Sequence, residues 1–373
     1  MQLTFFAILC VLCSIAAYYL IRSMVWTLPV SRLAKCFLSL LVLAICAGFP
    51  INRAYGHAIT NPLLNTALLC TGAMTCYLVT LGVMRDVLLV PLILLKKNVI
   101  KARMWGGALV LILSLCFTTI GYHQAYDTKV VAVSVPLAST NPALANLCVV
   151  QLSDIHVTEQ TPKAWLKQIV AQTNALQPDI ICITGDIADL ELPDKDGHMA
   201  PLTKLRARYG IYYVDGNHEY IHGQIFAWRQ FAGALGFTLL HNRHVSLEHE
   251  GARIQIAGIP DSLSGQLGAG KGDVARALHS EQPHDLSILL SHRSQAIFDA
   301  PEQQLDLVLA GHTHGGQFFP WNIIVALAQP HLKGLYQEGA RQVYVNQGTG
   351  FWAIPNRLGT QSEITLIRFI PQS

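Results

Sequence analysis

The stretch GHTHGGQ, residues 311–317, places two histidines one residue apart in a run of glycines, directly after the apolar segment LDLVLA. A single histidine at the end of a strand is most often a polar residue with an ordinary hydrogen-bonding partner. Two histidines at this spacing, with glycine on both sides, indicate that they act together with partner residues elsewhere in the chain. The rest of the sequence must then supply the residues that complete such a site.

Four other apolar segments end in residues that can bind metals or transfer protons: VVQLSDIH, IICITGD, YYVDGNHE and SILLSH. Ligands bind at the carboxyl ends of strands in open α/β sheets, so we expect these residues at one edge. Any one of them alone is also typical of a turn or a helix cap. Their joint placement predicts one site made of Asp154, His156, Asp186, Asn217, His218, His292, His312 and His314.

The region from about residue 124 onward predicts a layered α/β domain. After a linker at 124–145, short apolar segments alternate with helical patterns. We expect strands within 147–152, 179–184, 211–215, 253–259, 286–291, 305–310, 342–346 and 363–369. Amphipathic helices are predicted at 162–176, 224–235, 272–280 and 294–300.

The order D-x-H, G-D, G-N-H, H and G-H-x-H resembles that of the calcineurin-like metallophosphoesterases, from about residue 146 to the C-terminus. The resemblance implies a β-sandwich flanked by helices, and hydrolysis of a phosphate ester by a hydroxide that bridges two metal ions. It also implies two sets of ligands that share Asp186: Asp154, His156 and His314 for one ion, and Asn217, His292 and His312 for the other.

The ligand types and two further residues fit this chemistry. Nitrogen and oxygen ligands without thiolate favour Mn, Fe or Zn as the two divalent ions. By the same resemblance, His218 does not bind metal and donates a proton to the leaving oxygen. Asp189, in the run GDIAD, would orient that histidine; the alternative is a surface carboxylate near the start of a helix.

Two further segments concern substrate binding. The sequence after His292 reads SHRSQ, where many relatives have Asn-Pro or a similar turn. Arg293 would contact a phosphate beside the metal site, or it would be a solvated arginine. The run NQGTGFWAIPNRLGTQSEITLIRF resembles that of the small bacterial branch of the family. Gly348, Gly350 and Arg357 would line the pocket, or they would be turn glycines and a core-edge arginine.

The first 123 residues differ in composition from the rest and predict a membrane region. The whole chain is 51% hydrophobic and 13% charged, against about 45–50% and about 25% in globular proteins. Four uncharged stretches have roughly the ~17–25 residues that a bilayer crossing needs, at 2–21, 36–51, 63–84 and 104–122. The first lacks the basic start and the cleavage site of a signal peptide, so we expect it to be retained.

The segment VLLVPLILL, residues 87–95, is too short to cross a bilayer. We interpret it as an interfacial or re-entrant helix; a fifth span there would reverse the topology downstream. Lysine and arginine are concentrated in the first and third loops, at Arg22, Arg32, Lys35, Arg85, Lys96, Lys97, Lys101 and Arg103. Because cytoplasmic loops carry such an excess, the region after residue 122 is predicted on the periplasmic or extracellular side of a bacterial inner membrane.

Charge and cysteine usage argue against several other classes. The net charge is +3, and the C-terminal region has no basic stripe that would indicate nucleic acid. Seven of the nine cysteines lie in the membrane region, where Cys10 and Cys13 are interpreted as apolar filler rather than a redox pair. We therefore expect no disulfide framework.

The sequence as a whole predicts a membrane region at 1–123, a linker at 124–145 and a catalytic domain at 146–373. The predicted function is a membrane-anchored, two-metal phosphoesterase. The alternatives are a lipid or nucleotide-sugar pyrophosphatase or phosphodiesterase, and a membrane sensor or scaffold without activity. His218 argues against the scaffold, because a binding module has no need for a proton donor.

The segment FFPWNIIVALAQPHLKGLY, which follows Gln317, bears on the substrate. Between Phe318 and Leu327 it is apolar on nearly every face, whereas a surface helix normally has a polar side. It would be a helix packed on the sandwich, or a membrane contact beside the active site. In the second case the bilayer is a partner and the phosphorylated substrate is a lipid.

Overall fold

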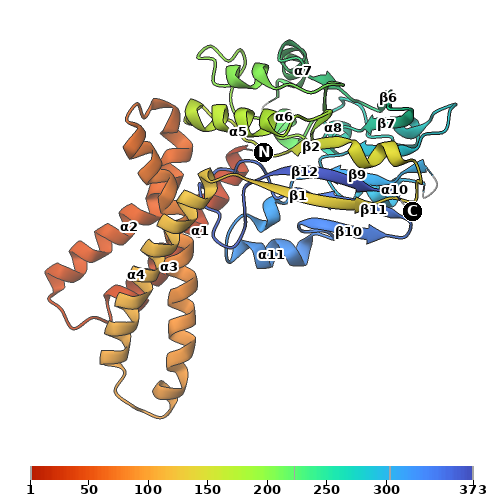
Figure 1. The fold of residues 1–373 in the computed structure, drawn as a ribbon. Helices are drawn as coiled ribbons and strands as arrows, with labels where there is room; N and C mark the ends of the chain where they lie inside the picture. The colour runs from red at the N-terminus through yellow and green to blue at the C-terminus, as the bar shows by residue number, and fades with distance from the viewer. Residues whose placement is uncertain (1, 222, 302–303, 372–373) are drawn as a thin grey trace. The chain divides into compact units, whose positions relative to one another are not determined.

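The computed structural model describes residues 2–221, 223–301 and 304–371. The chain divides into two compact units, whose elements are labelled in Figure 1. The helical unit comprises the residues up to 124 together with the short segment 353–358. The second unit, which we call the sheet unit, comprises residues 125–352 and those from 359 onward.

Four long helices form the helical unit: α1 (Gln2–Leu20), α2 (Arg32–Tyr55), α3 (Pro62–Leu94) and α4 (Ile100–Tyr126). Each helix, with α1 extended by the π-helical turn η1 (Ile21–Val25), is long and apolar enough to cross a membrane. Large apolar side chains such as Leu33, Leu63 and Trp105 are exposed on them. Exposed apolar surface of this kind is unfavourable in water, so these helices suit a lipid environment. The prediction of four long apolar helices is confirmed.

The helix bounds differ from the predicted ones because charged residues do not end these helices. Ser31 caps α2, its side chain accepting a hydrogen bond from the Ala34 amide, so the helix starts before the predicted residue 36. In α3, Arg85 and Asp86 form an ion pair (2.6 Å) within the helix. The segment 87–95 continues α3 as far as Leu94, with Pro91 inside it. The prediction of a separate interfacial or re-entrant helix at 87–95 is therefore wrong.

The segment 353–358 completes the helical unit. Asn356 is fully buried there. Its side chain accepts a hydrogen bond from the Tyr77 hydroxyl of α3 (2.8 Å) and donates to the Thr118 carbonyl of α4 (3.2 Å). Gly121 of α4 makes this approach possible, because a Cβ there would overlap the Asn356 side chain. The sequence did not predict that a C-terminal segment joins the helices.

Two six-stranded sheets form the centre of the sheet unit (Figure 1). The first has the order β1-β12-β2-β3-β4-β5 and the second β10-β11-β9-β8-β7-β6. The strands of the first sheet are β1 (Lys129–Pro136), β2 (Cys148–Leu152), β3 (Ile180–Ile183), β4 (Ile211–Tyr213), β5 (Thr238–Leu239) and β12 (Glu363–Ile370). Those of the second are β6 (Arg243–His249), β7 (Ala252–Gly258), β8 (Leu286–Leu290), β9 (Leu307–Ala310), β10 (Gly334–Glu338) and β11 (Arg341–Val345).

A hydrophobic core lies between the two sheets. It contains Val149 and Ile180 from the first sheet and Ile254 and Ile288 from the second, all fully buried. Further apolar clusters cover the outer faces. There α5 (Lys163–Ala175) and α7 (Ile225–Ala234) pack with the first sheet, and α9 (Val274–Leu278) and α10 (Ala296–Asp299) with the second. The predicted β-sandwich flanked by helices is confirmed.

The segment predicted as a linker, 124–145, instead contributes structure to the sheet unit. Its strand β1 runs parallel to β12, with Lys129 opposite Glu363 and Pro136 opposite Ile370. The alternation in KVVAVSVP is that of a strand with one buried face. A 3₁₀ helix, η3 (Pro142–Asn146), then leads into β2. The sheet unit therefore begins before the predicted boundary at residue 146.

Candidate metal centre

The predicted site residues follow the carboxyl ends of five strands. Within the first sheet β2, β3 and β4 are parallel neighbours, and within the second β8 and β9 are. Parallel strands end at the same edge of a sheet, so residues far apart in the chain come together there. The loops after these strands carry Asp154 and His156, Asp186, Asn217 and His218, His292, and His312 and His314.

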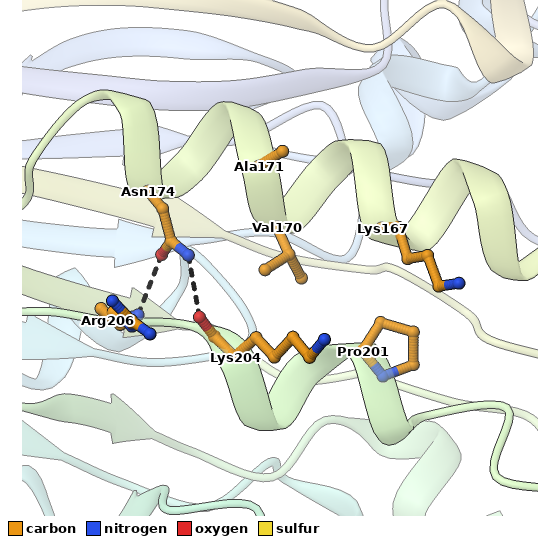
Figure 2. Close-up of a pocket in the computed structure, with 7 residues that line it drawn as sticks. All are labelled: Lys167, Val170, Ala171, Asn174, Pro201, Lys204 and Arg206. Carbon is orange, nitrogen blue, oxygen red and sulfur yellow. Dashed lines mark hydrogen bonds between the residues drawn. The ribbon is translucent and has the colours of Figure 1, made fainter.

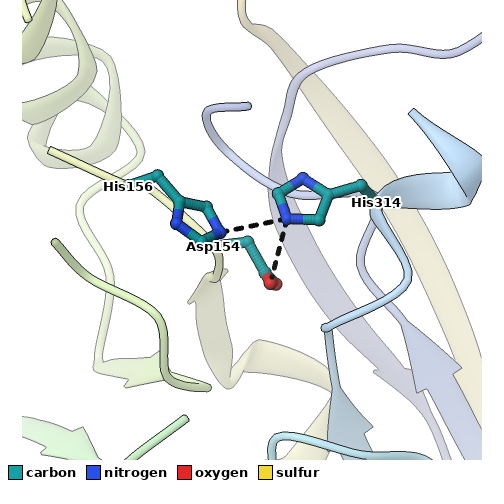
Figure 3. A group of neighbouring side chains, drawn as sticks. All are labelled: Asp154, His156 and His314. Carbon is teal, nitrogen blue, oxygen red and sulfur yellow. Dashed lines mark hydrogen bonds and ion pairs between the residues drawn. The ribbon is translucent and has the colours of Figure 1, made fainter. Parts of the chain in front are cut away.

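The first cluster consists of Asp154, His156 and His314 (Figure 3). The Nε2 atoms of His156 and His314 face each other at 3.1 Å. The Nε2 atom of His314 lies 3.4 Å from Oδ1 of Asp154. All three side chains are buried. Two ring nitrogens and a carboxylate oxygen that converge in this way offer three ligand atoms to one cation.

The second cluster consists of Asn217, His292 and His312, and it lies next to Asp186. The Nε2 atom of His292 lies 3.1 Å from Oδ1 of Asn217, 3.1 Å from Nδ1 of His312 and 3.2 Å from Oδ2 of Asp186. Asp186, His292 and His312 form a second group whose ligand atoms could hold a metal ion. Mixed nitrogen and oxygen donors, without thiolate, suit Mn, Fe or Zn.

Asp186 lies between the two clusters. Its Oδ2 atom is 3.2 Å from Nε2 of His292 and 3.7 Å from Nε2 of His156. Its Oδ1 atom accepts a hydrogen bond from the His218 amide (2.8 Å). Burial opposes ionisation, but positive charge on His292 and His218 holds the pKa of Asp186 well below its usual range. One carboxylate oxygen thus faces the ligand atoms of both clusters.

The backbone at these loops is held in an uncommon conformation. Five of the predicted ligands adopt positive φ values between 50° and 69°: Asp154, His156, Asp186, His312 and His314. Such values are rare outside glycine and concentrate at functional sites. Gly216 permits the close packing of these loops, because a Cβ at that position would overlap the Asp186 carboxylate. The loops that carry the predicted ligands are therefore closely packed against one another.

Asp189 connects His218 to the first cluster. Its Oδ1 atom lies 2.6 Å from Nδ1 of His218, and its Oδ2 atom lies 3.0 Å from Nδ1 of His156. Burial disfavours a charged imidazole, but the negative charges of Asp186 and Asp189 raise the pKa of His218 to about 9. The predicted neighbourhood of Asp189 and His218 is therefore present. Asp189 contacts His156 as well, which the sequence did not predict.

Arg293 lies beside the second cluster. Its Nη1 atom is 2.8 Å from Nε2 of His312, and its Nη2 atom is 3.4 Å from Oδ1 of Asn217. Its Nε atom donates to Asp261 (2.6 Å), a buried carboxylate that the sequence analysis missed. Burial, together with positive charge on His292 and Arg293, lowers the pKa of His312 to about 2. A neutral His312 has a lone pair for metal binding.

Arg357 belongs to the helical unit, where its amide donates to the Gly121 carbonyl (2.9 Å). Its side chain is fully buried. Its predicted place in the substrate pocket stays a prediction. Gly348 and Gly350 remain in the sheet unit. A Cβ on Gly350 would overlap the Ile155 backbone next to Asp154, so that glycine serves close packing beside the site.

Glu219, the last residue of GNHE, was also missed. Its fully buried carboxylate accepts hydrogen bonds from the amides of Asp186 (3.0 Å), Ile187 (2.7 Å) and Gly216 (2.8 Å). It ties the loop after β3 to the loop after β4, and so fixes Asp186 relative to Asn217. The burial of Glu219 between two loops leaves no periodic pattern in the sequence. The signal that could have found it is its position directly after Asn217 and His218 in the motif GNHE.

A cavity of about 370 Å³ lies between α5 and the 3₁₀ helix η4 (Ala200–Lys204), away from these clusters. Figure 2 shows its lining residues: Lys167, Val170, Ala171, Asn174, Pro201, Lys204 and Arg206. Asn174 links α5 to the segment after η4, since its side chain donates to the Lys204 carbonyl (2.8 Å) and accepts from the Arg206 amide (2.9 Å). The lining contains none of the predicted site residues.

Residues 148–316 match the family described as calcineurin-like phosphoesterase. The chain is 32% identical over 227 residues to YkuE, an uncharacterized metallophosphoesterase of Bacillus subtilis, covering 58% of this chain and 77% of that protein. It is 36% identical over 229 residues to an uncharacterized metallophosphoesterase of Helicobacter pylori, covering 61% of this chain and 60% of the relative.

A relative from Bos taurus carries the name transmembrane protein with metallophosphoesterase domain. It is 36% identical over 270 residues, which covers 69% of this chain and 61% of that protein. The matched region thus spans about three fifths of the length of the bovine and Helicobacter proteins.

Proposed function

Because this chain belongs to the calcineurin-like metallophosphoesterase family, we propose that it is a membrane-anchored hydrolase that cleaves a phosphate ester with two divalent metal ions. The observation that carries the proposal is the position of Asp186. Its Oδ2 atom faces His156 of the first cluster and His292 of the second. A carboxylate oxygen between two sets of ligands is the arrangement that a bridging ligand requires.

Two sets of residues would hold the ions, with Asp186 in both: Asp154, His156 and His314, and Asn217, His292 and His312. The donor set fits Mn, Fe or Zn. Bound ions would stabilise negative charge on the phosphoryl group and lower the pKa of the attacking water. The rest of the chemistry falls to residues of the chain.

His218 would act as the general acid. As the bond between phosphorus and the leaving oxygen breaks, its Nε2 proton passes to that oxygen, and water supplies the new oxygen on phosphorus. Asp189 holds Nδ1 of His218 at 2.6 Å, which fixes the ring orientation and leaves Nε2 to face the substrate. The negative charge of Asp189 also favours the protonated ring that a general acid must start from.

The test is hydrolysis by the purified full chain of an aryl monoester, an aryl diester, a phospholipid and a nucleotide-sugar lipid, with Mn and Zn added separately. The proposal predicts metal-dependent turnover of at least one substrate. The substrate that is cleaved distinguishes an ester hydrolase from a pyrophosphatase. Binding of metals without turnover of any of them would favour a sensor or scaffold instead.

The exposed helix α11 (Trp321–Ala328) supports a substrate at the membrane surface. No residue of this helix is buried, and Trp321, Ile323 and Ile324 are exposed. The helix begins seven residues after His314, and neighbouring Phe318 is the part that packs into the sheet unit. Apolar and aromatic side chains left exposed beside an active site are typical of a lipid contact. We therefore include a lipid phosphate among the substrates that the proposal favours.

Replacing Trp321, Ile323 and Ile324 by serine tests this point. Turnover of a lipid phosphate in vesicles should fall, while turnover of a soluble aryl phosphate and the thermal unfolding midpoint should stay unchanged. Phe226 and Phe298 are exposed apolar residues elsewhere in the sheet unit, and their replacement by serine is the matched control. An equal loss of both activities, with a lower midpoint, would make α11 part of the packed structure.

Loop charges support a sheet unit on the side of the membrane away from the cytoplasm. With four spans, the loop between α3 and α4, which contains Lys96 and Lys97, lies on the same side as the end of the first span and the start of α2. These two ends carry Arg22 and Arg32. Because cytoplasmic segments carry an excess of basic residues, we infer that both lie in the cytoplasm. A reporter fused after Ser373 that works only outside the cytoplasm should then be active. Activity of a cytoplasm-specific reporter at that position would reverse the topology.

A further inference from the structure

Arg293 and Asp261 form an ion pair at the open edge of the second cluster. We propose that this pair makes the site selective for phosphate monoesters: Arg293 binds the terminal phosphate oxygens, and Asp261 is the positioning residue that aims it. This inference rests on the proposed function, because it assigns a substrate class to the same site.

The geometry of Asp261 fixes one end of the arginine. The Asp261 side chain is fully buried, and its Oδ1 atom accepts a hydrogen bond from the Leu263 amide (2.9 Å). Its Oδ2 atom accepts from Nε of Arg293 (2.6 Å). A carboxylate held by the backbone cannot follow a moving arginine, so the guanidinium plane has a fixed anchor. The arginine side chain keeps 29% exposure, which leaves it open to a ligand.

The two terminal nitrogens of Arg293 face the metal ligands. Nη1 lies 2.8 Å from Nε2 of His312, and Nη2 lies 3.4 Å from Oδ1 of Asn217. The first contact requires Nε2 of His312 to be an acceptor. When Nδ1 of His312 binds a cation, the ring proton resides on Nε2, which then donates and can no longer accept from Arg293. Nη1 therefore needs a new acceptor whenever the site is loaded, and a phosphate oxygen beside the ligands supplies one.

Charge explains the preference for a monoester. A monoester near neutral pH carries up to two negative charges and three terminal oxygens, whereas a diester carries one charge and two terminal oxygens. A planar guanidinium gains most from the substrate that offers an additional charged oxygen. The side chains that contact Arg293 would not bind the phosphate in its place. His312 and Asn217 belong to the second cluster, and Asp261 is negatively charged.

The test compares Arg293→Gln with the native full chain on an aryl phosphate monoester and a diester with the same leaving group. We expect kcat/KM for the monoester to fall by roughly 10–100-fold, the usual range for a charged hydrogen bond, and that for the diester by less than about 3-fold. Asp261→Asn should reproduce part of the monoester loss, mainly in KM, and Asp261→Glu should restore some of it. The matched control is Arg208→Gln, which removes an exposed arginine paired with Asp179 and should change neither substrate.

A binding measurement separates this inference from the proposed function. Calorimetry with the Mn-loaded chain should show that inorganic phosphate binds more tightly than dimethyl phosphate, and that Arg293→Gln removes the difference while metal content stays unchanged. If the native chain cleaved neither ester but showed this binding pattern, the proposed function would fail and the inference would stand. Equal losses for both esters, or an unchanged preference for phosphate, would overturn the inference.

Discussion

The two clusters that meet at Asp186 differ in what lies behind their histidines. In the first, the Asp189 carboxylate faces Nδ1 of His156 at 3.0 Å. In the second, the Thr184 carbonyl faces Nδ1 of His292 at 2.7 Å, but His312 faces the Arg293 guanidinium at 2.8 Å. A metal-binding histidine normally donates its other N–H to an acceptor. His312 instead has a donor in that place.

This difference suggests that the two clusters have different tasks within one site. The acidic surroundings of the first cluster favour positive charge and hold His218, the proposed general acid, beside Asp189. The second cluster presents a guanidinium at its edge, which suits an incoming phosphate. The same metal-ligand chemistry can therefore serve proton transfer on one side and substrate binding on the other.

Asp186 is the residue that both clusters share, so its replacement should affect both clusters at once. Asp186→Asn keeps the side-chain size but loses the charge that a bridging ligand needs. We expect loss of both metal ions, measured by mass spectrometry of the bound metals, and turnover below detection. Asp306→Asn, a half-buried aspartate whose carboxylate accepts from the Ser287 amide, is the control and should keep both ions. Two retained ions in Asp186→Asn would contradict the bridging role.

Replacing His218 tests the catalytic task of the first side alone. His218→Ala should keep both ions, because the side chain is not among the proposed ligands. The rate on substrates with poor leaving groups should fall roughly 10²–10⁴-fold, and the loss should shrink as the leaving group improves. Rates are measured with a series of aryl phosphates of increasing acidity. Metal loss as large as in Asp186→Asn would make His218 a ligand instead.

Asp189 sharpens the comparison, because it contacts His156 of the first cluster. Asp189→Asn should weaken metal binding there by roughly 10–100-fold, the usual effect of removing a partner behind a ligand. The second site should bind as before, so a titration with Mn should change from two tight sites to one tight and one weak. Equal weakening of both sites would show that Asp189 acts on the whole loop framework.

The same variant has a signature in the metal-free protein. The charges of Asp186 and Asp189 raise the pKa of His218 to about 9, so the ring stays protonated at neutral pH. Removing the Asp189 charge should lower that pKa, because the protonated form loses a stabilising neighbour. An NMR titration of the ring carbon protons measures it directly. An unchanged pKa would assign the shift to Asp186 alone.

Replacing Glu219 gives the smallest expected effect. It tests whether this residue fixes the loop after β3 relative to the loop after β4. Glu219→Gln places an amide nitrogen against backbone amides that now donate to a carboxylate. The free energy of unfolding should fall by about 1–3 kcal/mol, the cost of a buried unpaired donor. Denaturant unfolding of the detergent-solubilised chain measures it. An unaltered midpoint would show that the loops after β3 and β4 are fixed by other contacts.

Local features of the site could be predicted from the sequence, and features that depend on distant pairing could not. Asp154 and His312 directly follow apolar strands, so strand pattern and chemistry suffice to place them. Asp261 gains its role only because the chain brings it to Arg293, 32 residues later. No periodic pattern records such a pairing.

The fold shows the same limit. The eight predicted strand segments each overlap a strand of the sheet unit, because an alternating or continuous apolar run is a local feature of the sequence. By contrast, β1 was taken for a linker, since its partner β12 lies more than 200 residues away. Likewise, the segment 353–358 joins the helical unit through Asn356, whose burial depends on Tyr77 and Gly121. The charged residues Arg85 and Asp86 suggested the end of a helix. The sequence alone does not show that they form an ion pair with each other inside α3.

The most direct test of a two-metal site centred on Asp186 is a crystal structure of the Mn-loaded chain with anomalous diffraction recorded at the Mn edge. The account predicts two anomalous peaks on either side of Asp186. One should be ligated by Asp154, His156 and His314 and the other by Asn217, His292 and His312, with the Asp186 carboxylate contacting both. A single peak in an intact fold, or two peaks that do not share Asp186, would contradict it.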